Sequence, residues 1–377
     1  MVIAVNTRFL LRGRLEGCGY FIQETFRILT HRYPQHQFFF LFDRPYSQEF
    51  VFSENVKPVV VSPAARTPLL WKIWFDFRIP SLLKKIRADV FVSPDGFCSL
   101  RSTVPQCLIV HDLAFLHHPS SYKKNHIWYL KRYMPDFLKK ASGIATVSDF
   151  SKKDLVKQYH LDPSAIKVVY NGVRSSFGSF DRNREIVKIR YTEGMEYFIY
   201  IGAIQPRKNL LHLLKAFSVF KKRMQSNMKL VFAGRMAWKN ENFVSLLKSY
   251  KYRHDLVFTD YLEDSELADL LSASYALVYP SLFEGFGVPV LEAMKSGVPA
   301  LTSENSSMQE IAGDAGLYFD PNNYNDIAEK MMMIYKDETL RIRMIEDGKR
   351  RAENFSWEHT AELLWEVIAR AASTRNQ

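Results

Sequence analysis

A chain of 377 residues is longer than one ordinary hydrophobic core, and a usual domain size of roughly 100–200 residues predicts two domains. With 47% hydrophobic residues and a net charge of +11, the composition excludes a disordered or fibrous protein, and no apolar run reaches the roughly 20 residues that span a bilayer. Cys18, Cys98 and Cys107 form no metal-type pair, which favours a reducing cytoplasm, and the first residues read as a strand without a signal pattern.

The charge is uneven along the chain. Residues 1–180 hold 25 Lys and Arg against 13 Asp and Glu, whereas residues 181–377 hold 26 against 27. This excess of cations predicts an anionic partner for the amino-terminal half, such as a membrane surface, an acidic acceptor or nucleic acid. The alternative is surplus surface charge that keeps the protein soluble.

Short apolar runs typical of buried strands alternate with amphipathic helical patterns. In the first half we expect strands at residues 2–5, 38–42, 59–61, 90–92, 108–110, 143–147 and 167–170. The polar stretch from Gly172 to about Glu196 reads as a linker, and further strands are expected at residues 197–201, 229–232, 256–258, 275–279 and 299–302. This alternation predicts two doubly wound α/β domains, with ligands beyond the carboxyl ends of the strands and in the cleft between the domains.

Two stretches of the first half carry weak signals. Gly13, Gly17 and Gly19 lie between the first strand and a helix, where bare backbone could approach a phosphate or sugar, although the full dinucleotide fingerprint is absent. Residues 71–87 mix Trp and Phe with Lys and Arg, which suits a membrane interface as well as rings packed on a sheet.

His111 and Asp112 follow the strand expected at residues 108–110. A histidine there can donate to a sugar hydroxyl or a developing charge, and Asp112 could fix its tautomer or bind a hydroxyl. The alternative is a structural histidine whose hydrogen bonds are satisfied within the protein.

Arg207 and Lys208 stand in a loop before a helix that opens near Asn209. Two cations at a helix amino end oppose its dipole, and a bound diphosphate would neutralise them; otherwise they are solvated loop cations. Further along, the loop of residues 259–263 could line a nucleobase pocket through Tyr261.

The stretch from Ser281 to Ser303 reads as a glycine-bearing loop, a helix that starts near Pro289 and ends at Gly297, and a strand. Unpaired N–H groups at such a helix start form an anion site. Glu284 in the loop and Glu292 in the first turn or so of the helix are natural acceptors for sugar hydroxyls. The plainer interpretation is one solvated loop carboxylate and one that serves the helix dipole.

Together these stretches resemble the retaining family 4 glycosyltransferases of the GT-B fold. The resemblance rests on the order and spacing of VHDL, ATVSDFSKKDL, VVYNGV, YIGAIQPRKNLLHLLKAF, PSLFEGFGVPVLEAMKSGVPALTS and EIAGDAGLYFDP. It implies two Rossmann-like domains facing across a cleft, residues 1–178 for the acceptor and 179–356 for the nucleotide sugar. It also implies that residues 357–377 form a helix that crosses back to the first domain.

The resemblance also assigns residues. Glu284 would contact the transferred sugar and Glu292 the ribose, and His111 would contact the donor sugar near the anomeric centre. Many members have arginine directly after the glycine where this chain has Gly202 and Ala203, so Arg207 would supply that charge. The implied donor-binding set is Gly17, Gly19, Gly202, Arg207, Lys208, Tyr261, Glu284, Phe286, Gly287, Val288, Val290 and Glu292; His111, Glu284, Arg207 and Lys208 would be catalytic, with Asp112 on the acceptor side.

The implied function is transfer of a hexose, with retention at the anomeric carbon, from a nucleotide diphosphate sugar such as GDP-mannose or a UDP-sugar. The acceptor would be a glycan or lipid-linked intermediate of cell-surface polysaccharide or lipopolysaccharide synthesis. We expect no metal, other cofactor or nucleic-acid partner, and a cytoplasmic location with peripheral binding to an anionic membrane left open. The rival interpretations are a sugar-nucleotide epimerase, a phosphorolytic enzyme and a non-catalytic nucleotide-sugar sensor on the same scaffold.

Overall fold

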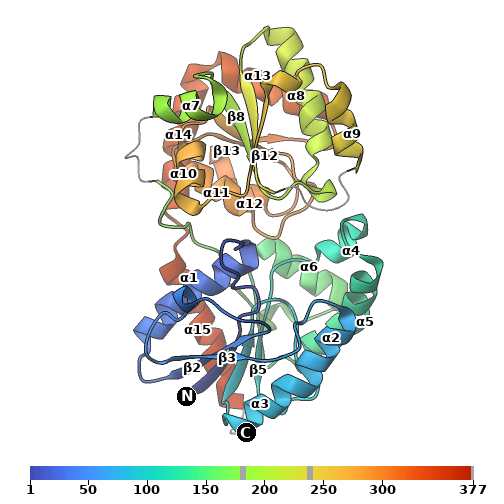
Figure 1. Cartoon of the computed structure of the whole chain (residues 1–377), viewed down its shortest axis with the longest axis vertical. Helices are drawn as coiled ribbons and strands as arrows, with labels where there is room; N and C mark the ends of the chain where they lie inside the picture. Colours follow the sequence, from blue (N-terminus) through green and yellow to red (C-terminus); the bar gives the residue numbers. More distant parts are fainter. Residues whose placement is uncertain (179–183, 236–240, 375–377) are drawn as a thin grey trace. The chain divides into compact units, whose positions relative to one another are not determined.

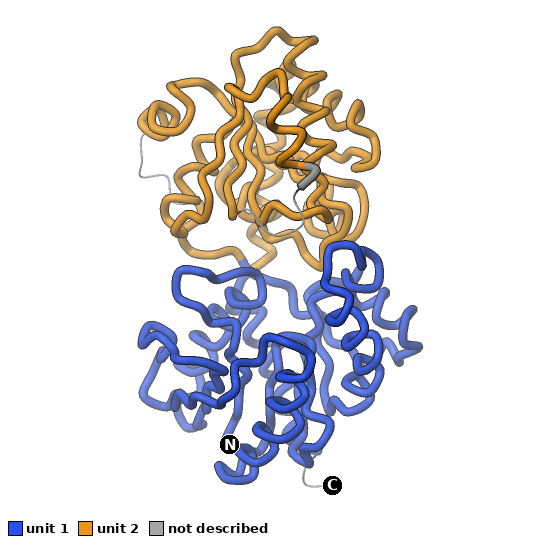
Figure 2. Tube along the Cα trace, turned by 45° about the vertical axis from the view of Figure 1, so that its right-hand side comes forward, with its two compact units in different colours: residues 1–172, 356–377 blue, residues 173–355 orange. Residues whose placement is uncertain are grey.

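The computed structural model describes residues 1–178, 184–235 and 241–374, and the chain divides into two compact units. Unit 1 comprises residues 1–172 and 356–377, and unit 2 comprises residues 173–355 (Figure 2). The division therefore follows Gly172, ahead of the boundary after residue 178 that the sequence suggested.

Unit 1 is built on a seven-stranded parallel sheet in the order β3-β2-β1-β4-β5-β6-β7 (Figure 1). Its strands are β1 (Val2–Asn6), β2 (Gln37–Phe42), β3 (Val56–Val60), β4 (Val90–Ser93), β5 (Gln106–Val110), β6 (Gly143–Thr146) and β7 (Ile166–Val168). Its helices are α1 (Gly17–Arg32), α2 (Pro68–Ile73), α3 (Ile79–Lys85), α4 (Ala114–His117), α5 (Lys124–Lys140), α6 (Asp149–Tyr159) and α15 (Trp357–Ser373). A π-helical turn, Trp74–Arg78, joins α2 to α3.

Unit 2 is built on a six-stranded parallel sheet in the order β10-β9-β8-β11-β12-β13. Its strands are β8 (Tyr197–Ile201), β9 (Lys229–Ala233), β10 (Leu256–Asp260), β11 (Ala276–Tyr279), β12 (Ala300–Ser303) and β13 (Gly316–Phe319). Its helices are α7 (Arg184–Thr192), α8 (Leu210–Met224), α9 (Glu241–Ser249), α10 (Asp264–Ser272), α11 (Val288–Lys295), α12 (Met308–Ala312), α13 (Tyr324–Lys336) and α14 (Glu338–Ala352).

The central strands are buried along their whole length, which is why they appear in the sequence as continuous apolar runs. Every residue of β5, β8 and β11 is buried, as expected for parallel strands covered by helices on both faces. Each strand expected from the sequence overlaps an observed one. The edge strand β13 was not expected, because its first three residues are only half-buried and form no such run.

The stretch read as a linker also contains regular structure, which corrects that interpretation. Helix α7 lies within it, and its Ile186 and Ile189 side chains are exposed. Of its aliphatic side chains only Val187 is buried, and the helix is too short and too polar to stand out from the surrounding polar stretch.

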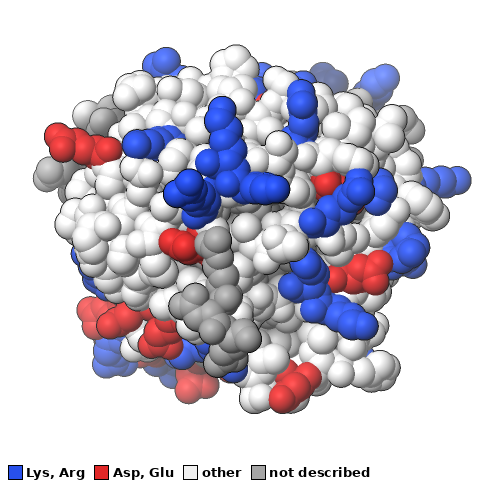
Figure 3. All heavy atoms as spheres, turned by 90° about the horizontal axis from the view of Figure 1, so that it is seen from below, with Lys and Arg blue, Asp and Glu red and all other residues white. Residues whose placement is uncertain are grey.

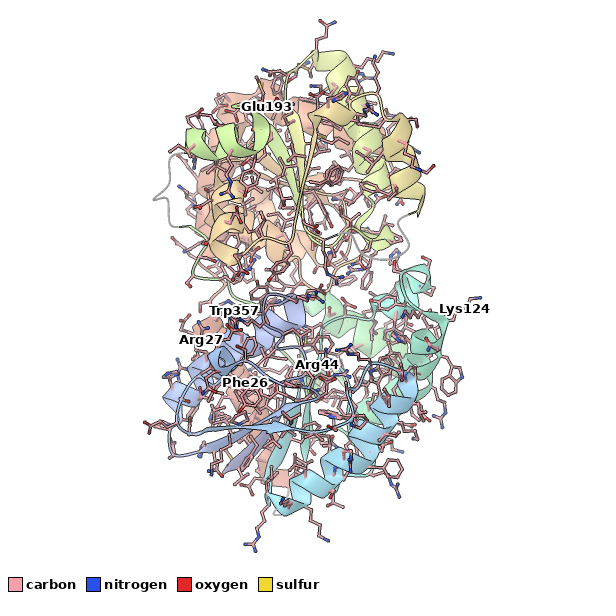
Figure 4. All side chains as sticks on the ribbon, in the orientation of Figure 1. Phe26, Arg27, Arg44, Lys124, Glu193 and Trp357 are labelled. Carbon is pink, nitrogen blue, oxygen red and sulfur yellow. The ribbon has the colours of Figure 1, made fainter. Side chains whose placement is uncertain are left out.

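The carboxyl-terminal helix α15 packs on the sheet of unit 1. A β-carbon at Gly143 in β6 would lie 2.9 Å from a methyl carbon of Val367 in α15. At Gly172 a β-carbon would lie 2.3 Å from the amide nitrogen of Trp357, the first residue of α15 (Figure 4). The chain thus leaves unit 1 and returns to it through two segments in direct contact. Among the described residues, no helix combines the length and apolarity needed to cross a membrane.

Candidate active site

Two loops of unit 2 meet where the strand order of its sheet reverses. β8 and β11 are neighbours in the sheet although β9 and β10 separate them in the chain. The amide of Leu282, after β11, donates a hydrogen bond of 2.9 Å to the carbonyl oxygen of Arg207, in a 3-10 turn after β8. Doubly wound sheets bind ligands at such a reversal. Here the reversal brings together Arg207, Lys208 and Glu284, as the sequence suggested.

The buried side chain of Glu284 collects four polar groups on its Oε1 atom. Lys208 Nζ and Ser281 Oγ each donate a hydrogen bond of 2.5 Å, and the Tyr279 hydroxyl donates one of 3.1 Å. Arg207 Nη1 lies 3.1 Å from the same oxygen. Lys208 also donates to the Tyr279 hydroxyl at 2.7 Å. The cation pair that the sequence suggested for a diphosphate therefore shares one carboxylate in this structure, which offsets one of its two positive charges.

Together the two cations have a larger effect on the pKa of Glu284 than burial has. Burial raises the pKa of Glu284, but Arg207 and Lys208 lower it further, to about 2. Burial, and next the charge of Glu284, raise the pKa of the nearby Tyr200 and Tyr279 hydroxyls. At neutral pH the cluster therefore holds one carboxylate, two cations and neutral phenols.

Glu292, in the second turn of α11, has a different partner. Its side chain accepts a hydrogen bond of 2.6 Å from Arg174 Nε, and Arg174 Nη1 donates another of 2.6 Å to Asp264. Burial raises the pKa of Glu292, and the shared guanidinium lowers it by less, so the net shift is upward. The sequence did not single out Arg174, which lies in the stretch read as a linker. Asp264, the first residue of α10, also pairs with this arginine.

Each of the two glutamates is held through a single oxygen of its own carboxylate. Within the described residues, every hydrogen bond to the side chains of Glu284 and Glu292 falls on Oε1, and Oε2 has none. Their burial and ion pairs also rule out the plainer interpretation of a solvated loop carboxylate and a group that only serves the helix dipole. A carboxylate held in this way can accept hydroxyl donors at its second oxygen.

The backbone between them offers two N–H groups at the start of α11. Gly287 has φ of 100°, and a β-carbon there would lie 2.4 Å from the Met308 methyl carbon, so the position requires glycine. Within the described residues, the N–H groups of Gly287 and Val288 donate no hydrogen bond. The amide of Val290 donates to the Gly287 carbonyl at 3.0 Å, so this N–H is already engaged within the protein, and the place of Val290 in the donor-binding set stays a prediction. Phe286 is buried.

Two further donor-side candidates lie on other loops of unit 2. The amide of Gly202 donates to Ala233 at 2.9 Å, and a β-carbon at Gly202 would lie 3.0 Å from the Tyr200 hydroxyl oxygen. Tyr261 is half-buried in the loop after β10, two strands away from β8. Among the described residues, Tyr261 makes no hydrogen bond to the Glu284 cluster.

In unit 1, His111 stands at the end of β5. Its Nε2 atom lies 2.8 Å from the Pro94 carbonyl oxygen, and because a carbonyl only accepts, Nε2 carries the hydrogen. Burial lowers the pKa of His111, so the ring is neutral near pH 7 and presents a lone pair at Nδ1. Asp112 accepts from the Ala114 amide at 2.9 Å. Pro94, rather than Asp112, therefore fixes the histidine tautomer; of the two roles suggested for Asp112, binding of a hydroxyl stays a prediction.

A buried ion pair missed from the sequence supports this turn. Asp95 accepts hydrogen bonds of 2.5 Å from Arg8 Nε and 2.7 Å from Asn6 Nδ2. Cys18 donates to the Pro94 carbonyl at 3.1 Å. Arg8 and Asp95 follow β1 and β4, the neighbouring strands at which the sheet order of unit 1 reverses. The strand-end reasoning that identified His111 could therefore have found them.

The glycines of α1 have different roles. Gly17 is exposed at the helix start, and a β-carbon there would meet nothing within 4 Å. At Gly19 a β-carbon would lie 2.7 Å from the Phe9 carbonyl oxygen, so the protein's own packing accounts for this glycine. Within the described parts of the chain, no three His, Cys, Asp or Glu side chains gather in a way that would hold a metal ion.

Comparisons with known proteins agree with this architecture. The chain matches the family models described as Glycosyltransferase Family 4, over residues 22–177, and Glycosyl transferases group 1, over residues 181–351. An Escherichia coli protein named O-antigen chain mannosyltransferase B is 30% identical over 253 residues, which cover 66% of this chain and 66% of that protein. The chain thus spans just under two thirds of that relative's length.

Solved structures share the fold. WaaG, a glycosyltransferase involved in lipopolysaccharide biosynthesis, superposes with a TM-score of 0.78 at 16% identity, over 97% of this chain and 99% of that one. Anabaena HepE, solved in complex with UDP-glucose, gives a TM-score of 0.77 at 14% identity, over 98% and 99%. The chain belongs to family 4 of the glycosyltransferases, with the GT-B fold.

Proposed function

We propose that this protein transfers a hexose from a nucleotide diphosphate sugar to a hydroxyl of a glycan or lipid-linked acceptor, with retention at the anomeric carbon. The observation that carries the proposal is the Glu284 cluster at the strand-order reversal of unit 2. One oxygen of this buried carboxylate is held by Lys208 and Arg207, and the other has no hydrogen bond within the described residues.

The cations suit the leaving group. Cleavage of the bond between sugar and phosphate builds negative charge on the diphosphate, and preorganised cations stabilise such charge. Arg207 and Lys208 would bind these oxygens, assisted by the N–H groups of Gly287 and Val288 at the start of α11. The diphosphate would then share the cations with Glu284.

The chemical state of Glu284 argues for binding rather than proton transfer. A carboxyl group with a pKa of about 2 is a poor general base near neutral pH. We therefore assign Glu284 to hold hydroxyls of the transferred sugar through Oε2, and Glu292 to hold the ribose in the same way. The leaving phosphate itself would take the proton of the acceptor hydroxyl.

The candidates in unit 1 complete the proposal. Neutral His111 would accept a hydrogen bond from a donor-sugar hydroxyl at Nδ1, because Nε2–H is engaged by Pro94. Asp112 would lie on the acceptor side.

The named relatives guide the choice of substrate. The Escherichia coli relative is named an O-antigen chain mannosyltransferase, which supports GDP-mannose as the first donor to test, and the HepE complex supports UDP-glucose as the second. The acceptor would belong to cell-surface polysaccharide synthesis at the inner face of the membrane. Transfer would require no metal, and full activity in EDTA is the result expected.

The test combines donor binding with transfer. A panel of nucleotide sugars is screened by thermal shift, since a donor stabilises the folded state in proportion to its affinity. The best donor is then incubated with lipid-linked acceptor extracts, and the product's anomeric configuration is read by NMR. Glu284→Gln should lower transfer by about 1,000-fold, on the scale of losing a preorganised charged contact, whereas the exposed Glu329→Gln on α13 should leave it unchanged.

Several outcomes would contradict the proposal. Wild-type turnover by Glu284→Gln would remove the assigned role of that residue. An epimerised sugar formed from donor alone would favour an epimerase, and tight donor binding without product from any acceptor extract would favour a sensor.

A further inference from the structure

One flank of unit 1 exposes large apolar side chains among cations. Leu69 in α2, Phe77 in the π-helical turn and Trp128 in α5 are 70%, 52% and 62% exposed. Helices α2, α3 and α5 run along the same flank of unit 1 (Figure 1). We call this surface the basic–aromatic face; its members are Leu69, Lys72, Phe77, Arg78, Arg101, Lys124, Trp128, Lys131, Arg132 and Lys139.

The outward side of α5 carries a single acid, Asp136, which pairs with Arg132 at 3.0 Å. Its exposed residues recur at helical spacing and form one stripe: Lys124, Asn125, Trp128, Lys131, Arg132, Pro135 and Lys139. Lys124 points away from the unit at the start of the helix (Figure 4). A solvated helix normally mixes charges of both signs on this side, so a row of cations around a single tryptophan calls for an explanation.

Contacts between side chains join the segments of this face at two places. Lys72 Nζ of α2 lies 4.8 Å from the ring centroid of Tyr133 in α5, and Arg132 stacks on the same ring at 5.1 Å. The Trp128 ring meets the Tyr133 ring edge-on at 6.4 Å. At the other end Arg101 lies over the Phe77 ring, 4.5 Å from its centroid.

Packing in the core explains the buried rings of this region, but it does not explain the exposed apolar side chains. Trp71, Trp74 and Phe75 are buried in the core of unit 1, which confirms for them the expectation of rings packed on the sheet. Leu69, Phe77 and Trp128 remain largely outside. Exposed apolar groups of this size, clustered among cations, mark an interaction surface.

The charge of the face identifies the partner. Residues 68–87 and 124–140 together hold ten Lys and Arg against two Asp and Glu. The two acids, Asp76 and Asp136, pair with Lys72 and Arg132 within their own segments. On the end of unit 1 that Figure 3 shows, Lys and Arg side chains gather among several Asp and Glu side chains, whereas the two acids of residues 68–87 and 124–140 are each paired. Such a surface is complementary to a dense layer of anions, and its rings suit the depth of lipid headgroups.

We propose that the basic–aromatic face docks unit 1 on an anionic phospholipid bilayer. Trp128 and Phe77 insert at headgroup level, and the surrounding lysines and arginines contact lipid phosphates. Membrane binding by this face needs no sugar donor, so it can be tested separately from the proposed transfer reaction.

The test is sedimentation of the full chain with vesicles of phosphatidylcholine alone or mixed with phosphatidylglycerol. Wild-type protein should bind the anionic vesicles, should release them with added salt, and should ignore the neutral ones. Each cation near an anionic surface is worth about fivefold in partition, so Lys131→Glu with Arg132→Glu should weaken binding by about 30-fold or more. Trp128→Ser should weaken it by about tenfold, through lost apolar burial.

The matched control reverses two exposed cations of α8 in unit 2, Lys222→Glu with Arg223→Glu, and changes net charge equally. It should reduce binding by less than about twofold, and thermal melting should show all variants folded. Equal losses in face and control variants, or no loss at Trp128→Ser, would overturn the proposal. Binding to RNA or heparin without binding to anionic vesicles would also overturn it.

Discussion

Glu284 and Glu292 lie eight positions apart in one loop–helix stretch, and their pKa values shift in opposite directions. Both carboxylates are buried, and burial by itself raises the pKa of each. They differ in their partners. Glu284 meets two cations and two hydroxyls, whereas Glu292 meets one guanidinium that it shares with Asp264. The direction of the shift is therefore set by the local balance of charge rather than by depth.

Under the proposed function, this difference in charge would give the two residues different roles. Glu284 stays charged at any physiological pH and holds two cations where a diphosphate would need them, so it suits binding at the reacting end of a donor. The pKa of Glu292 is raised, so this carboxylate is protonated more readily than Glu284, and it lies further along α11. It suits a contact that orients the donor without sharing the developing charge.

The largest expected effect comes from removing the charge of each glutamate in turn. Glu284→Gln leaves two buried cations without their anion and should lower the free energy of unfolding by about 3–5 kcal/mol at pH 7. Glu292→Gln leaves Arg174 its partner Asp264 and should cost less than about 2 kcal/mol. Urea denaturation of both variants measures the contrast. Equal losses would mean that burial, and not the number of cations, controls this region.

The pH dependence of stability should also have opposite signs at the two residues. Because the folded pKa of Glu284 is about 2, below its ordinary 4.5, its stabilisation of about 3 kcal/mol is present above pH 4.5 and is lost as pH falls towards 2. The folded pKa of Glu292 is raised, so its stabilisation is full below pH 4.5 and is lost as pH rises through the folded value.

Unfolding measured from pH 7 down to pH 3 tests these signs. As pH falls, the difference in free energy of unfolding between wild type and Glu284→Gln should shrink. Over the same range, the free energy of unfolding of wild type should rise relative to that of Glu292→Gln. A parallel pH dependence in wild type and Glu284→Gln would contradict the low pKa.

Arg174 offers a way to sharpen the comparison. Arg174→Met removes the only cation that contacts Glu292 among the described residues, and should raise the pKa of Glu292 further while costing about 2 kcal/mol of stability. Lys208→Met should cost less, because Arg207 remains beside Glu284. Chemical denaturation at pH 7 ranks the two. A larger loss at Lys208 would show that Arg207 does not compensate.

How far the sequence predicted this region depends on the kind of contact. Loop cations, loop glycines and the two glutamates were found because each stands in a loop that follows a strand or within the first two turns of the next helix, and topology brings such positions together. Arg174 was missed because it belongs to a segment without strand or helix pattern. Its contacts with Glu292 and Asp264 join positions 118 and 90 residues away, which periodicity does not reveal.

The sequence also suggested the cations but not their neutralising partner. Arg207 and Lys208 looked unbalanced because only the helix dipole was considered. The neighbouring placement of β8 and β11 brings Glu284 to them, and that placement is a property of sheet order. In unit 1, by contrast, the His111 tautomer is set by a backbone carbonyl, which leaves no trace in residue identity.

The smallest expected effect concerns His111, where burial acts without a cationic partner. Burial lowers its pKa, so a ¹⁵N spectrum should show the Nε2–H tautomer near neutral pH and a titration below the ordinary 6.5. Asp112→Asn should leave the tautomer unchanged, because Asp112 caps the Ala114 amide and the Pro94 carbonyl holds the ring. Asp95→Asn, which weakens the ion pair with Arg8 beneath that turn, should loosen the Pro94 contact and let the Nδ1–H tautomer appear. A tautomer change in Asp112→Asn with none in Asp95→Asn would reverse the assignment and return to Asp112 the role first expected of it.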